Sequence, residues 1–528
     1  MGGFLVTDST HHDIADRALA VASPLRIVVL GGGSAGWLVA GYLATLGRQS
    51  SVRQLTVTLV ESDTIARIGV GEATVPSIRG TLSLLGLREE DFINEADATY
   101  KQAIEFVGWS TGTDEDAFFH PFDKRPVAIP DTSLHRWLNS DRAIRWDHYI
   151  SPQSRLCSKN YSPKADAPWP DYASPLPYAY HMDADGFGHS LRQHFAQNGV
   201  NHIVATVKHV ELEPVSGNIT SLQTEDGQEI AGDLFIDCSG MRGQLIDKTL
   251  GVGYQSLSDK LLCDRAVALR VPLTADEAQR PYTRSVAMSS GWRWEIPLRS
   301  RLGTGYVYSS AHCSREAAEQ DLRAQLGARA DGVPARHLSF DVGYREAFWS
   351  RNVIAMGMAG GFIEPLESTA IYLVEAAASL LCTMLPQGPH HTVFAQHFNR
   401  SMSQLYEEVT DFVNFHYVMS NRQDTDFWRD ASDPARATEN VRGLMALWLE
   451  KPPTVFDFPY PFRLFSPQSY EHILFGMKTS YPCGMTVNAR LCEPLPETEK
   501  AVKEGLAGFL PTNRALAGFR TKGEPEHA

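Results

Sequence analysis

The stretch "RIVVLGGGSAGWLVAGYLATLG", residues 26–47, decides the fold. It predicts an apolar β-strand, a glycine turn and an Ala- and Leu-rich helix, and Gly31, Gly33 and Gly36 fit the pattern G-x-G-x-x-G. Such a turn lets backbone amides approach a pyrophosphate at the positive end of the helix. A second apolar strand, "LTVTLVES", follows and carries Glu61 at its end, where a carboxylate would bind a ribose hydroxyl. This order of elements predicts a Rossmann-like dinucleotide site.

Two later segments favour a flavin over a nicotinamide dinucleotide. "GDLFIDCSGMRG", residues 232–243, predicts an apolar strand that runs into Ser-Gly and resembles the strand returning to the nucleotide in two-part FAD folds. "NVIAMGMAGGFIEPLEST", residues 352–369, predicts another strand, a glycine turn and a helix. Aromatic hydroxylases commonly carry Gly-Asp at that turn, whereas this chain has Gly357-Met358. The sequence therefore predicts an FAD fold without the hydroxylase signature.

The domain organisation follows from length and periodicity. A chain of 528 residues is too long for a single compact core. We expect an α/β protein: a two-part FAD-binding fold, with a Rossmann-like nucleotide-binding core and mixed sheets, plus a helical C-terminal subdomain on the substrate side. The predicted parts are a loose extension (1–24), the FAD module with inserted substrate-facing segments (25–390), a mainly helical part (391–512) and a tail (513–528). Apolar residues at helical spacing in "FAQHFNRSMSQLYEEVTDFVNFHYVMS" support the helical part.

Composition restricts the partners. The net charge of -14 argues against nucleic acid and against an anionic membrane surface. The most apolar window, residues 27–46, is the glycine motif itself, so we expect no membrane span. Seven scattered cysteines without a CxxC pair indicate reduced thiols, no metal site and a cytoplasmic protein. The first 24 residues lack a basic segment followed by an apolar one, so no targeting signal is expected.

The segment "SGWRWEIPL", residues 290–298, contains two tryptophans. On a strand, Trp292 and Trp294 share one face, and Pro297 ends the strand or marks a sheet edge. Two interpretations stay open at this point. The segment is either a core strand that buries two indoles, or a bulky, inert wall beside a reactive cofactor.

Several segments jointly resemble one enzyme family. "GVGEAT", "FFHPF", "YAYHMDAD", "RPYTRSVAMSSGW" and "FIEPLEST" occur in the order found in flavin-dependent tryptophan halogenases, and the likeness extends over roughly residues 25–480. The mid-chain segments look closest to tryptophan 5-halogenases. The resemblance implies that reduced FAD (FADH2) and oxygen turn chloride or bromide into hypohalous acid, which halogenates an electron-rich aromatic compound. Free tryptophan, another indole and a different arene all stay open as substrates.

The resemblance also implies partners. Only one dinucleotide fingerprint is present, so a separate flavin reductase is expected to supply FADH2, and homodimer formation is left open. An alternative is a flavin-dependent aromatic monooxygenase. The two tryptophans and the missing Gly-Asp argue against it. A third is a flavin-binding protein without turnover.

The family motifs assign site residues. Lys101, in "TYKQAIEF", matches the catalytic lysine and acts either as a proton donor that polarises hypohalous acid or as a transient haloamine. The segment "EPLEST" offers two carboxylates, Glu364 and Glu367, and the second matches the catalytic glutamate, which helps to position the oxidant and removes the ring proton. The amides of Thr369 and Ala370 fall where the family binds halide. Glycine is usual at the second of these positions, and alanine lacks its freedom at positive φ.

The remaining assignments concern the substrate and the cofactor. His120 and Phe122 match residues lining the substrate pocket, and Trp292 and Trp294 would separate flavin from substrate. The residues expected to contact FAD are Gly31, Gly33, Ser34, Ala35, Gly36, Glu61, Gly69, Gly71, Glu72, Ala73, Val207, Met358 and Ile371.

Overall fold

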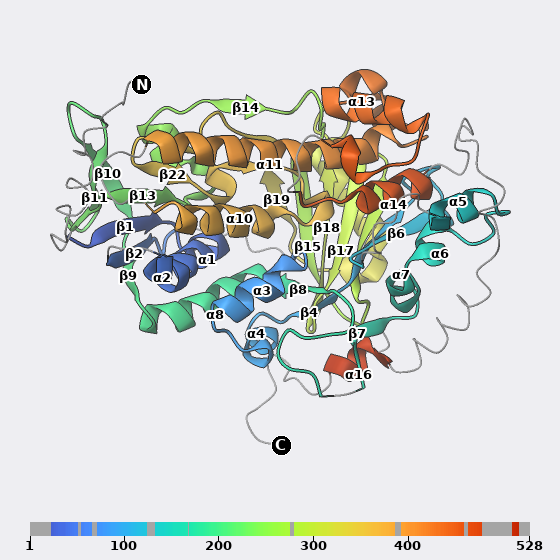
Figure 1. Ribbon diagram of the computed structural model, residues 1–528, viewed down its shortest axis with the longest axis horizontal. Helices are drawn as coiled ribbons and strands as arrows, with labels where there is room; N and C mark the ends of the chain where they lie inside the picture. Colours follow the sequence, from blue (N-terminus) through green and yellow to red (C-terminus); the bar gives the residue numbers. More distant parts are fainter. Residues whose placement is uncertain are drawn as a thin grey trace, which may run out of the picture.

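Two large sheets organise the molecule, and one long helix extends from the region of the first to that of the second (Figure 1). The computed structural model describes residues 23–50, 54–65, 71–123, 132–166, 168–274, 279–385, 392–458, 463–477 and 509–516. The orange helices α10 (Ala370–Thr383) and α11 (Thr392–Val418) lie along the long axis of the molecule. α10 lies in the half with the first sheet, where it contacts α1 and α3, and α11 extends from there to the half that holds the second large sheet.

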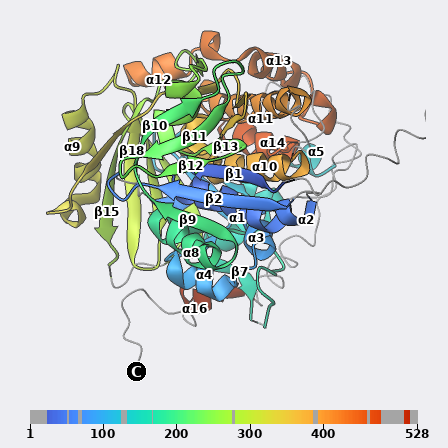
Figure 2. The same ribbon diagram turned by 90° about the vertical axis from the view of Figure 1, so that its left-hand side faces the viewer.

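The first sheet has six strands and carries the predicted dinucleotide turn. Its order is β21 (Trp349–Ser350), β22 (Val353–Ala355), β13 (Leu234–Asp237), β1 (Leu25–Leu30), β2 (Leu55–Glu61) and β9 (Val200–Val204). All neighbours except β21 and β22 pair in parallel, so β22, β13 and β1 end at the same edge. β1 and β2 are almost continuously buried, as expected for parallel strands covered on both faces. Figure 2 shows this sheet with α8 (Ala184–Gln197) against it.

The second sheet has seven strands and is mixed. Its order is β19 (Arg336–Ser339), β15 (Arg265–Pro272), β18 (Arg301–Tyr308), β17 (Gly291–Pro297), β16 (Tyr282–Met288), β5 (Ala103–Val107) and β6 (Ala117–Pro121). Only β16 and β5 pair in parallel. The two tryptophans lie on β17, which is flanked on both sides, so Pro297 ends a central strand and does not mark an edge.

Smaller sheets complete the strands. They comprise β3 (Gly71–Ala73), β8 (Ala179–Asp183) and β4 (Thr99–Lys101); β10 (Val207–Leu212), β11 (Ile219–Thr224) and β12 (Glu229–Ala231); β14 (Tyr254–Ser256), β20 (Gly343–Arg345) and β23 (Gly361–Phe362); and β7 (Tyr161–Ala165) with β24 (Phe509–Pro511). The β7–β24 pair brings residues 509–511 back to the first half of the chain as a strand, a feature absent from the helical expectation for this region.

Helices cover the sheets and connect them. Besides α8, α10 and α11 they are α1 (Ser34–Tyr42), extended by a π-helical segment (Leu43–Gly47), α2 (Arg48–Ser50), α3 (Ser77–Leu84), α4 (Glu89–Glu95), α5 (Thr132–Leu138), α6 (Trp146–Ile150), α7 (Pro152–Cys157), α9 (Arg315–Leu326), α12 (Asp426–Ala431), α13 (Glu439–Trp448), α14 (Pro467–Met477) and α16 (Thr512–Leu516). The predicted α/β class, mixed sheets and helical C-terminal region are therefore confirmed.

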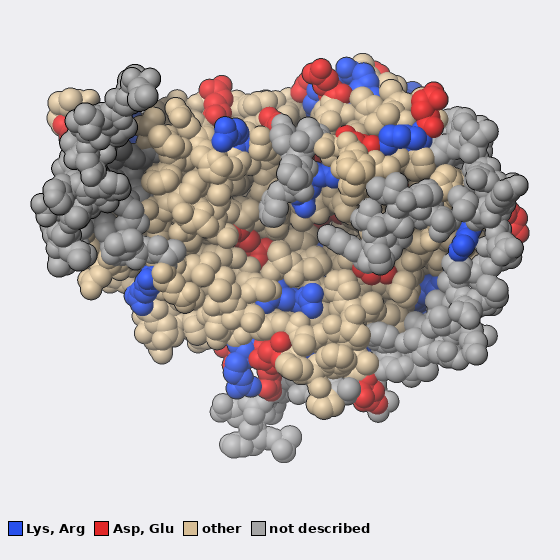
Figure 3. Space-filling model, viewed as in Figure 1, with Lys and Arg blue, Asp and Glu red and all other residues tan. Residues whose placement is uncertain are grey.

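On one face of the molecule, charges of both signs are mixed. On the face shown in Figure 3, the charged side chains of the described residues lie in small groups of both signs among uncharged ones. Among the helices of the described ranges, none has a stretch long and apolar enough to cross a bilayer.

Candidate functional site

The predicted dinucleotide turn lies between β1 and α1. Gly31 has a φ of +117°, and a Cβ there would lie 2.2 Å from the carbonyl oxygen of Cys238. A Cβ on Gly36 would lie 1.8 Å from the carbonyl oxygen of Gly31, which explains the third glycine. A Cβ on Gly33, in contrast, would meet no atom within 4 Å, and no side chain caps α1. Open space and uncapped amides at a helix N-terminus fit the diphosphate of FAD.

The neighbouring predicted cofactor residues gather around this cradle. Ser34 Oγ donates a 3.0 Å hydrogen bond to the carbonyl oxygen of Ala184, at the start of α8. A Cβ on Gly357 would lie 2.9 Å from Cβ of Ala35, so the turn that contains Met358 lies against α1. Three turns far apart in sequence thus meet at one edge of the six-stranded sheet.

Glu61 is buried at the end of β2. Its Oε1 lies 2.8 Å from Nε2 of His202, and a Cβ on Gly32 would overlap its carboxylate. The carboxylate is therefore adjacent to the cradle, at the position expected for ribose recognition.

Other residues expected to contact FAD are more dispersed. Glu72 and Ala73 lie on β3, and burial raises the pKa of Glu72 to about 7. Val207 is the first residue of β10, and Ile371 is buried in the first turn of α10. Gly69 lies outside the described residues, and Gly71 is the first residue of β3. The contacts of all these residues with FAD stay predictions.

Lys101 ends β4 and is 0 % exposed. Its Nζ donates to the carbonyl oxygen of Thr74 at 3.0 Å and to Oγ of Ser368 at 2.8 Å, and lies 5.2 Å from the ring centroid of Phe122. Within the described ranges, no carboxylate oxygen lies within 4.0 Å of this ammonium group. Burial lowers the pKa of Lys101 to about 7, although the charge of Glu367 acts in the opposite direction. Such a lysine changes protonation state near neutral pH.

Glu367 ends a short 3₁₀ turn (Pro365–Glu367) and is held by two histidines. Its carboxylate lies 3.0 Å from Nδ1 of His120 and 2.9 Å from Nε2 of His416. Burial alone would raise the pKa of Glu367, but the charges and hydrogen bonds of the histidines outweigh it and lower the pKa to about 2. The other ring nitrogen of His416, Nδ1, lies 2.6 Å from the carbonyl oxygen of Phe412, so both ring nitrogens have hydrogen-bond partners.

The chain continues from Glu367 into the predicted halide segment. Ser368 adopts a left-handed conformation, with a φ of +61°, and its hydroxyl receives the Lys101 hydrogen bond. Thr369 is the N-cap of α10 and Ala370 its first residue, and no side chain caps this helix. The left-handed residue in this turn is Ser368 rather than Ala370, so an alanine at this position causes no backbone strain here.

The two tryptophans are both buried on the same face of β17, with ring centroids 6.4 Å apart. Trp292 donates from Nε1 to Oε2 of Glu364 at 2.9 Å, and Tyr417 donates to the same oxygen at 2.9 Å. Burial raises the pKa of Glu364 to about 7, although these two hydrogen bonds lower it. Trp292 is thereby oriented by a carboxyl group that lies three residues before Glu367.

Aromatic side chains from the C-terminal half close the site. Phe412 of α11 stacks on Phe465 with ring centroids 3.9 Å apart and contacts Tyr470 of α14 at 4.8 Å. The ring of His120 lies 5.5 Å from that of Phe412. The helical C-terminal region thus supplies an apolar cover beside Glu367.

Comparisons with known proteins agree with this geometry. The family model described as tryptophan halogenase matches residues 26–487. Tryptophan 6-halogenase SttH of Streptomyces toxytricini is 35% identical over 86% of this chain and 89% of its own length, and tryptophan 7-halogenase RebH of Lentzea aerocolonigenes is 35% identical over 76% and 78%. The structure of Xcc4156, a flavin-dependent halogenase from Xanthomonas campestris, superimposes with a TM-score of 0.85 at 32% identity, covering 95% of this chain and all of that one.

The chain belongs to the tryptophan halogenase family. Its relatives indicate an enzyme of this kind, a flavin-dependent halogenase, and the family as a whole depends on FAD and halide. The names of SttH and RebH refer to positions 6 and 7 of tryptophan, so membership of the family does not support the likeness to 5-halogenases in particular.

Sequence reasoning did not single out Ser368, His416 and Tyr417, and it weighed Glu364 as the catalytic carboxylate but chose Glu367. Ser368 hydrogen-bonds to Lys101, Glu364 to Trp292 and Tyr417, and His416 to Glu367. His416 and Tyr417 lie in the helical run "VNFHYV", where a histidine among apolar residues reads as part of the core. The polar residues of "FIEPLEST" were the available signal, because a buried turn with two glutamates and a serine needs partners.

Proposed function

We propose that the protein uses reduced FAD, oxygen and chloride or bromide to halogenate an electron-rich aromatic compound, tryptophan or a related indole, beside Lys101. The observation that carries this proposal is the buried group of Lys101, Ser368 and Glu367, in which a lysine with a pKa of about 7 hydrogen-bonds to the residue that follows an ionised carboxylate. FAD supplies the oxygen chemistry that converts halide into hypohalous acid. A separate flavin reductase is expected to deliver the reduced form.

Lys101 acts on the oxidant. Two acceptors, the carbonyl oxygen of Thr74 and the hydroxyl of Ser368, each take one hydrogen of the ammonium group. The third N–H remains available to donate to the oxygen of hypohalous acid, which makes its halogen more electrophilic. We therefore assign the charged form of Lys101 to this step.

Glu367 acts on the ring proton. With a pKa of about 2, its carboxylate is a weak base, but the proton on a halogenated aromatic cation is strongly acidic, so a weak base suffices. Its negative charge also stabilises that cation, and His120 and His416 hold the carboxylate in place. We expect Phe122 and His120 to line the substrate side.

Trp292 and Trp294 separate this site from the cofactor. Their position on a central strand, with Trp292 oriented by Glu364, supports the interpretation as a rigid wall as well as a piece of core. Thr369 and Ala370, at the uncapped start of α10, would receive the halide.

A product screen tests the proposal. Purified protein is incubated with a flavin reductase, oxygen and bromide on panels of tryptophan, indole and phenol compounds, and products are mapped by mass spectrometry and NMR. Exchange of one hydrogen for bromine supports the proposal and identifies the carbon attacked. Gain of one oxygen regardless of halide would instead indicate a monooxygenase, and FAD binding without oxygen use a protein without turnover.

A further inference from the structure

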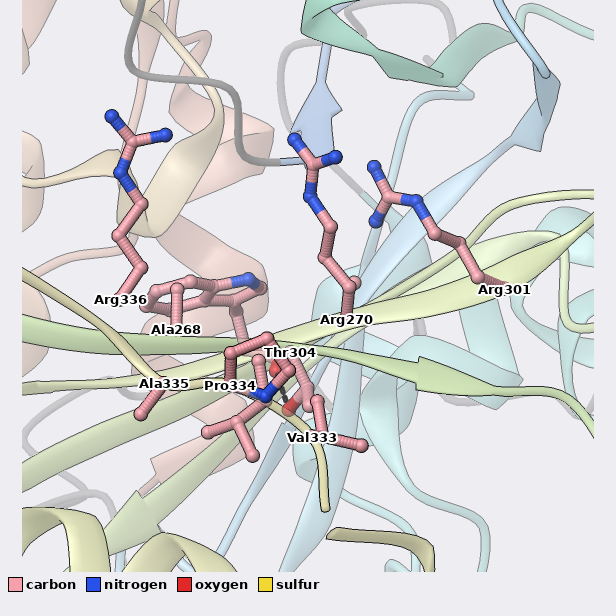
Figure 4. Close-up of a pocket in the computed structure, with 11 residues that line it drawn as sticks. Ala268, Arg270, Arg301, Thr304, Val333, Pro334, Ala335 and Arg336 are labelled. Atoms are coloured by element: carbon pink, nitrogen blue, oxygen red, sulfur yellow. Dashed lines mark hydrogen bonds between the residues drawn. The ribbon is translucent and has the colours of Figure 1, made fainter. Parts of the chain in front are cut away.

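A cavity of about 320 Å³ lies on the seven-stranded sheet, over β15, β18 and β19, and Trp294 of β17 forms part of its wall. Figure 4 shows three other members of this wall, Arg270, Arg301 and Arg336, rising from the strands on the same side. The space holds on the order of ten water molecules, so an acid made of one oxygen and one halogen fits easily. The proposed halogenation steps give Trp294 the role of a barrier and leave the space beside it unused.

The indole of Trp294 rests on the backbone of the sheet. Trp294 is paired with Gly305 of β18, and Gly305 with Ala268 of β15. A Cβ on Gly305 would lie 2.2 Å from the indole, so the ring lies directly over this glycine. The next side chain along this row is only the methyl group of Ala268, which also lines the cavity. The row therefore contributes no bulky side chain that would cover the indole.

The two tryptophans of the wall differ in access. Trp292 is 2 % exposed, and its indole N–H donates to Glu364. Trp294 is 7 % exposed, and its indole N–H donates to no atom of the described ranges. Of the two indoles, that of Trp294 is therefore the one that a small molecule in the cavity reaches.

The cavity is connected to the predicted FAD cradle by a short run of contacts. Arg301 of its wall donates to a carboxylate oxygen of Asp183, which is the N-cap of α8. The next residue, Ala184, accepts the hydrogen bond from Ser34 at the start of α1. The wall of the cavity is thus two residues away from a direct contact with the cradle.

The direction of β8 places Lys101 at the other end of the same strand. Ala179, at the start of β8, is paired with Lys101, whereas Asp183, at its end, is paired with Gly71. Gly71 is one of the residues expected to contact FAD. The cavity therefore lies toward the expected flavin side, away from the lysine where the aromatic compound is expected to react.

The lining selects one oxidisable group. Sulfur-containing side chains are the usual targets of oxidants in proteins. The described lining of this cavity contains no cysteine, methionine, tyrosine or histidine. Its electron-rich side chain is the indole of Trp294, and an indole is also the class of compound that the proposed reaction halogenates. A wall made of indoles is therefore a barrier that the oxidant can attack.

We propose that Trp294 is a modification site: when no aromatic substrate is bound beside Lys101, hypohalous acid formed at the flavin enters this cavity and oxidises the Trp294 indole to an oxindole. The site rests on the proposed function, which supplies the oxidant. A bound substrate consumes the oxidant at Lys101 and so protects Trp294.

The reaction balances without a further reagent. The halogen of the acid is transferred to C3 of the indole, and the hydroxide left behind takes the proton of the indole nitrogen and leaves as water. A water molecule then adds at C2, and the loss of halide with a proton leaves the oxindole. The indole loses two electrons and gains one oxygen atom from water, while the halogen is reduced to halide.

Peptide mapping after turnover without substrate tests the site. The full-length protein is incubated with a flavin reductase, oxygen and bromide in labelled water (H₂¹⁸O), and its peptides are analysed by mass spectrometry. Trp294 is expected to gain one ¹⁸O atom about tenfold more often than Trp292 or Trp169, because the oxidant is formed close to it. Addition of tryptophan, or of another compound that the product screen shows to be halogenated, should reduce the label. Absence of label at Trp294 overturns the proposal.

Trp169 is the matched control for oxidant in solution, because it is 38 % exposed. Excess free methionine destroys hypohalous acid in solution but not in the cavity, so the label at Trp294 should persist in its presence. Equal label at Trp169 and Trp294, or loss of the Trp294 label with methionine, refutes the site.

Bromide and the source of oxygen identify the oxidant. Without halide, Trp294 should stay unmodified. Oxygen gained without bromide, or taken from O₂ instead of water, would mean that the flavin oxygenates the indole directly, which contradicts the proposal. The variant Trp294→Phe should lack the labelled residue, and transfer of the label to Trp292 at the same level would show that the cavity does not select Trp294.

The two proposals fail separately. If the same preparation halogenates an aromatic compound but Trp294 stays unlabelled, only the modification site falls. If no aromatic compound is halogenated, the proposed function falls, while a bromide-dependent label at Trp294 would still show that the oxidant is formed. If neither is seen, both fall.

Discussion

Two glutamates of one turn, Glu364 and Glu367, have opposite chemistry although both are buried. Glu364 faces the tryptophan wall, where neutral donors from Trp292 and Tyr417 bind a single oxygen, and its pKa rises to about 7. Glu367 faces the lysine site, where His120 and His416 contact its carboxylate, and its pKa falls to about 2. Burial acts alike on both, so the charge of the partners decides which carboxyl group is ionised.

The difference separates two functions. An ionised Glu367 balances positive charge that develops on the substrate, whereas Glu364 is a hydrogen-bond acceptor that orients an indole. Substitutions at each end of this turn should therefore have effects of very different size.

The largest effect is expected at Lys101, on the Glu367 side. Lys101→Met keeps the length of the side chain but removes its donor, and should lower the halogenation rate by about 10² to 10⁴-fold. FAD binding, followed by flavin fluorescence, should stay unchanged, because the hydrogen bonds of Lys101 go to Thr74 and Ser368 and not to the cradle at α1. A Met variant that halogenates at the wild-type rate would remove Lys101 from the mechanism.

The different roles of the two glutamates are tested by comparing the variants Glu367→Gln and Glu364→Gln. Loss of the Glu367 charge should reduce the single-turnover halogenation rate by about 10- to 100-fold, since charge stabilisation and the base are lost together. The Glu364 variant can still accept from Trp292 and Tyr417, so its rate should fall by less than about threefold. Similar losses in both variants, with circular dichroism confirming that each is folded, would contradict the division of roles.

A pH profile tests the charge state of Lys101. Because the pKa of Lys101 is about 7 and the charged form is assigned to the step, the single-turnover rate should fall about tenfold per pH unit above that value. Stopped-flow measurement with saturating halide and substrate gives this profile. A rate that rises through pH 7 would instead identify the neutral amine and a haloamine.

Substitution of Glu364 is expected to have the smallest effect on activity but a measurable effect on stability. Its pKa of about 7 in the folded protein exceeds the usual carboxyl value of 4.5, so the folded state binds more protons between these values. This extra proton binding stabilises the folded state by up to about 3 kcal/mol. The stabilisation is fully present below about pH 4.5 and is lost as the pH rises through about 7.

Glu364→Gln should remove that pH dependence. Urea unfolding gives the free energy of unfolding of wild type and variant at pH 5 and at pH 8. Between these pH values it should fall more in the wild type than in the variant. Parallel pH dependence in both proteins would mean that Glu364 does not titrate as described.

Local sequence patterns predicted the strand, glycine turn and helix of residues 26–47 correctly, because these elements are contiguous in the chain. The position of Lys101 was proposed from a family motif, but its burial and its bond to Ser368 could not be read from the chain, because the two residues are 267 positions apart. Assignment of Thr369 and Ala370 to halide stays a prediction.

The sequence by itself determined the elements whose physics is local: the glycine cradle, the parallel strands with their buried faces, and the alternation that places Trp292 and Trp294 on one side of β17. The tertiary structure alone decided what surrounds each ionisable group. His416 of α11 helps to keep Glu367 ionised, and Gly305 of β18 lies between Trp294 and Ala268 of the two neighbouring strands. Protonation states and cavities depend on long-range neighbours, so the opposite behaviour of two glutamates in one hexapeptide is a property of the fold.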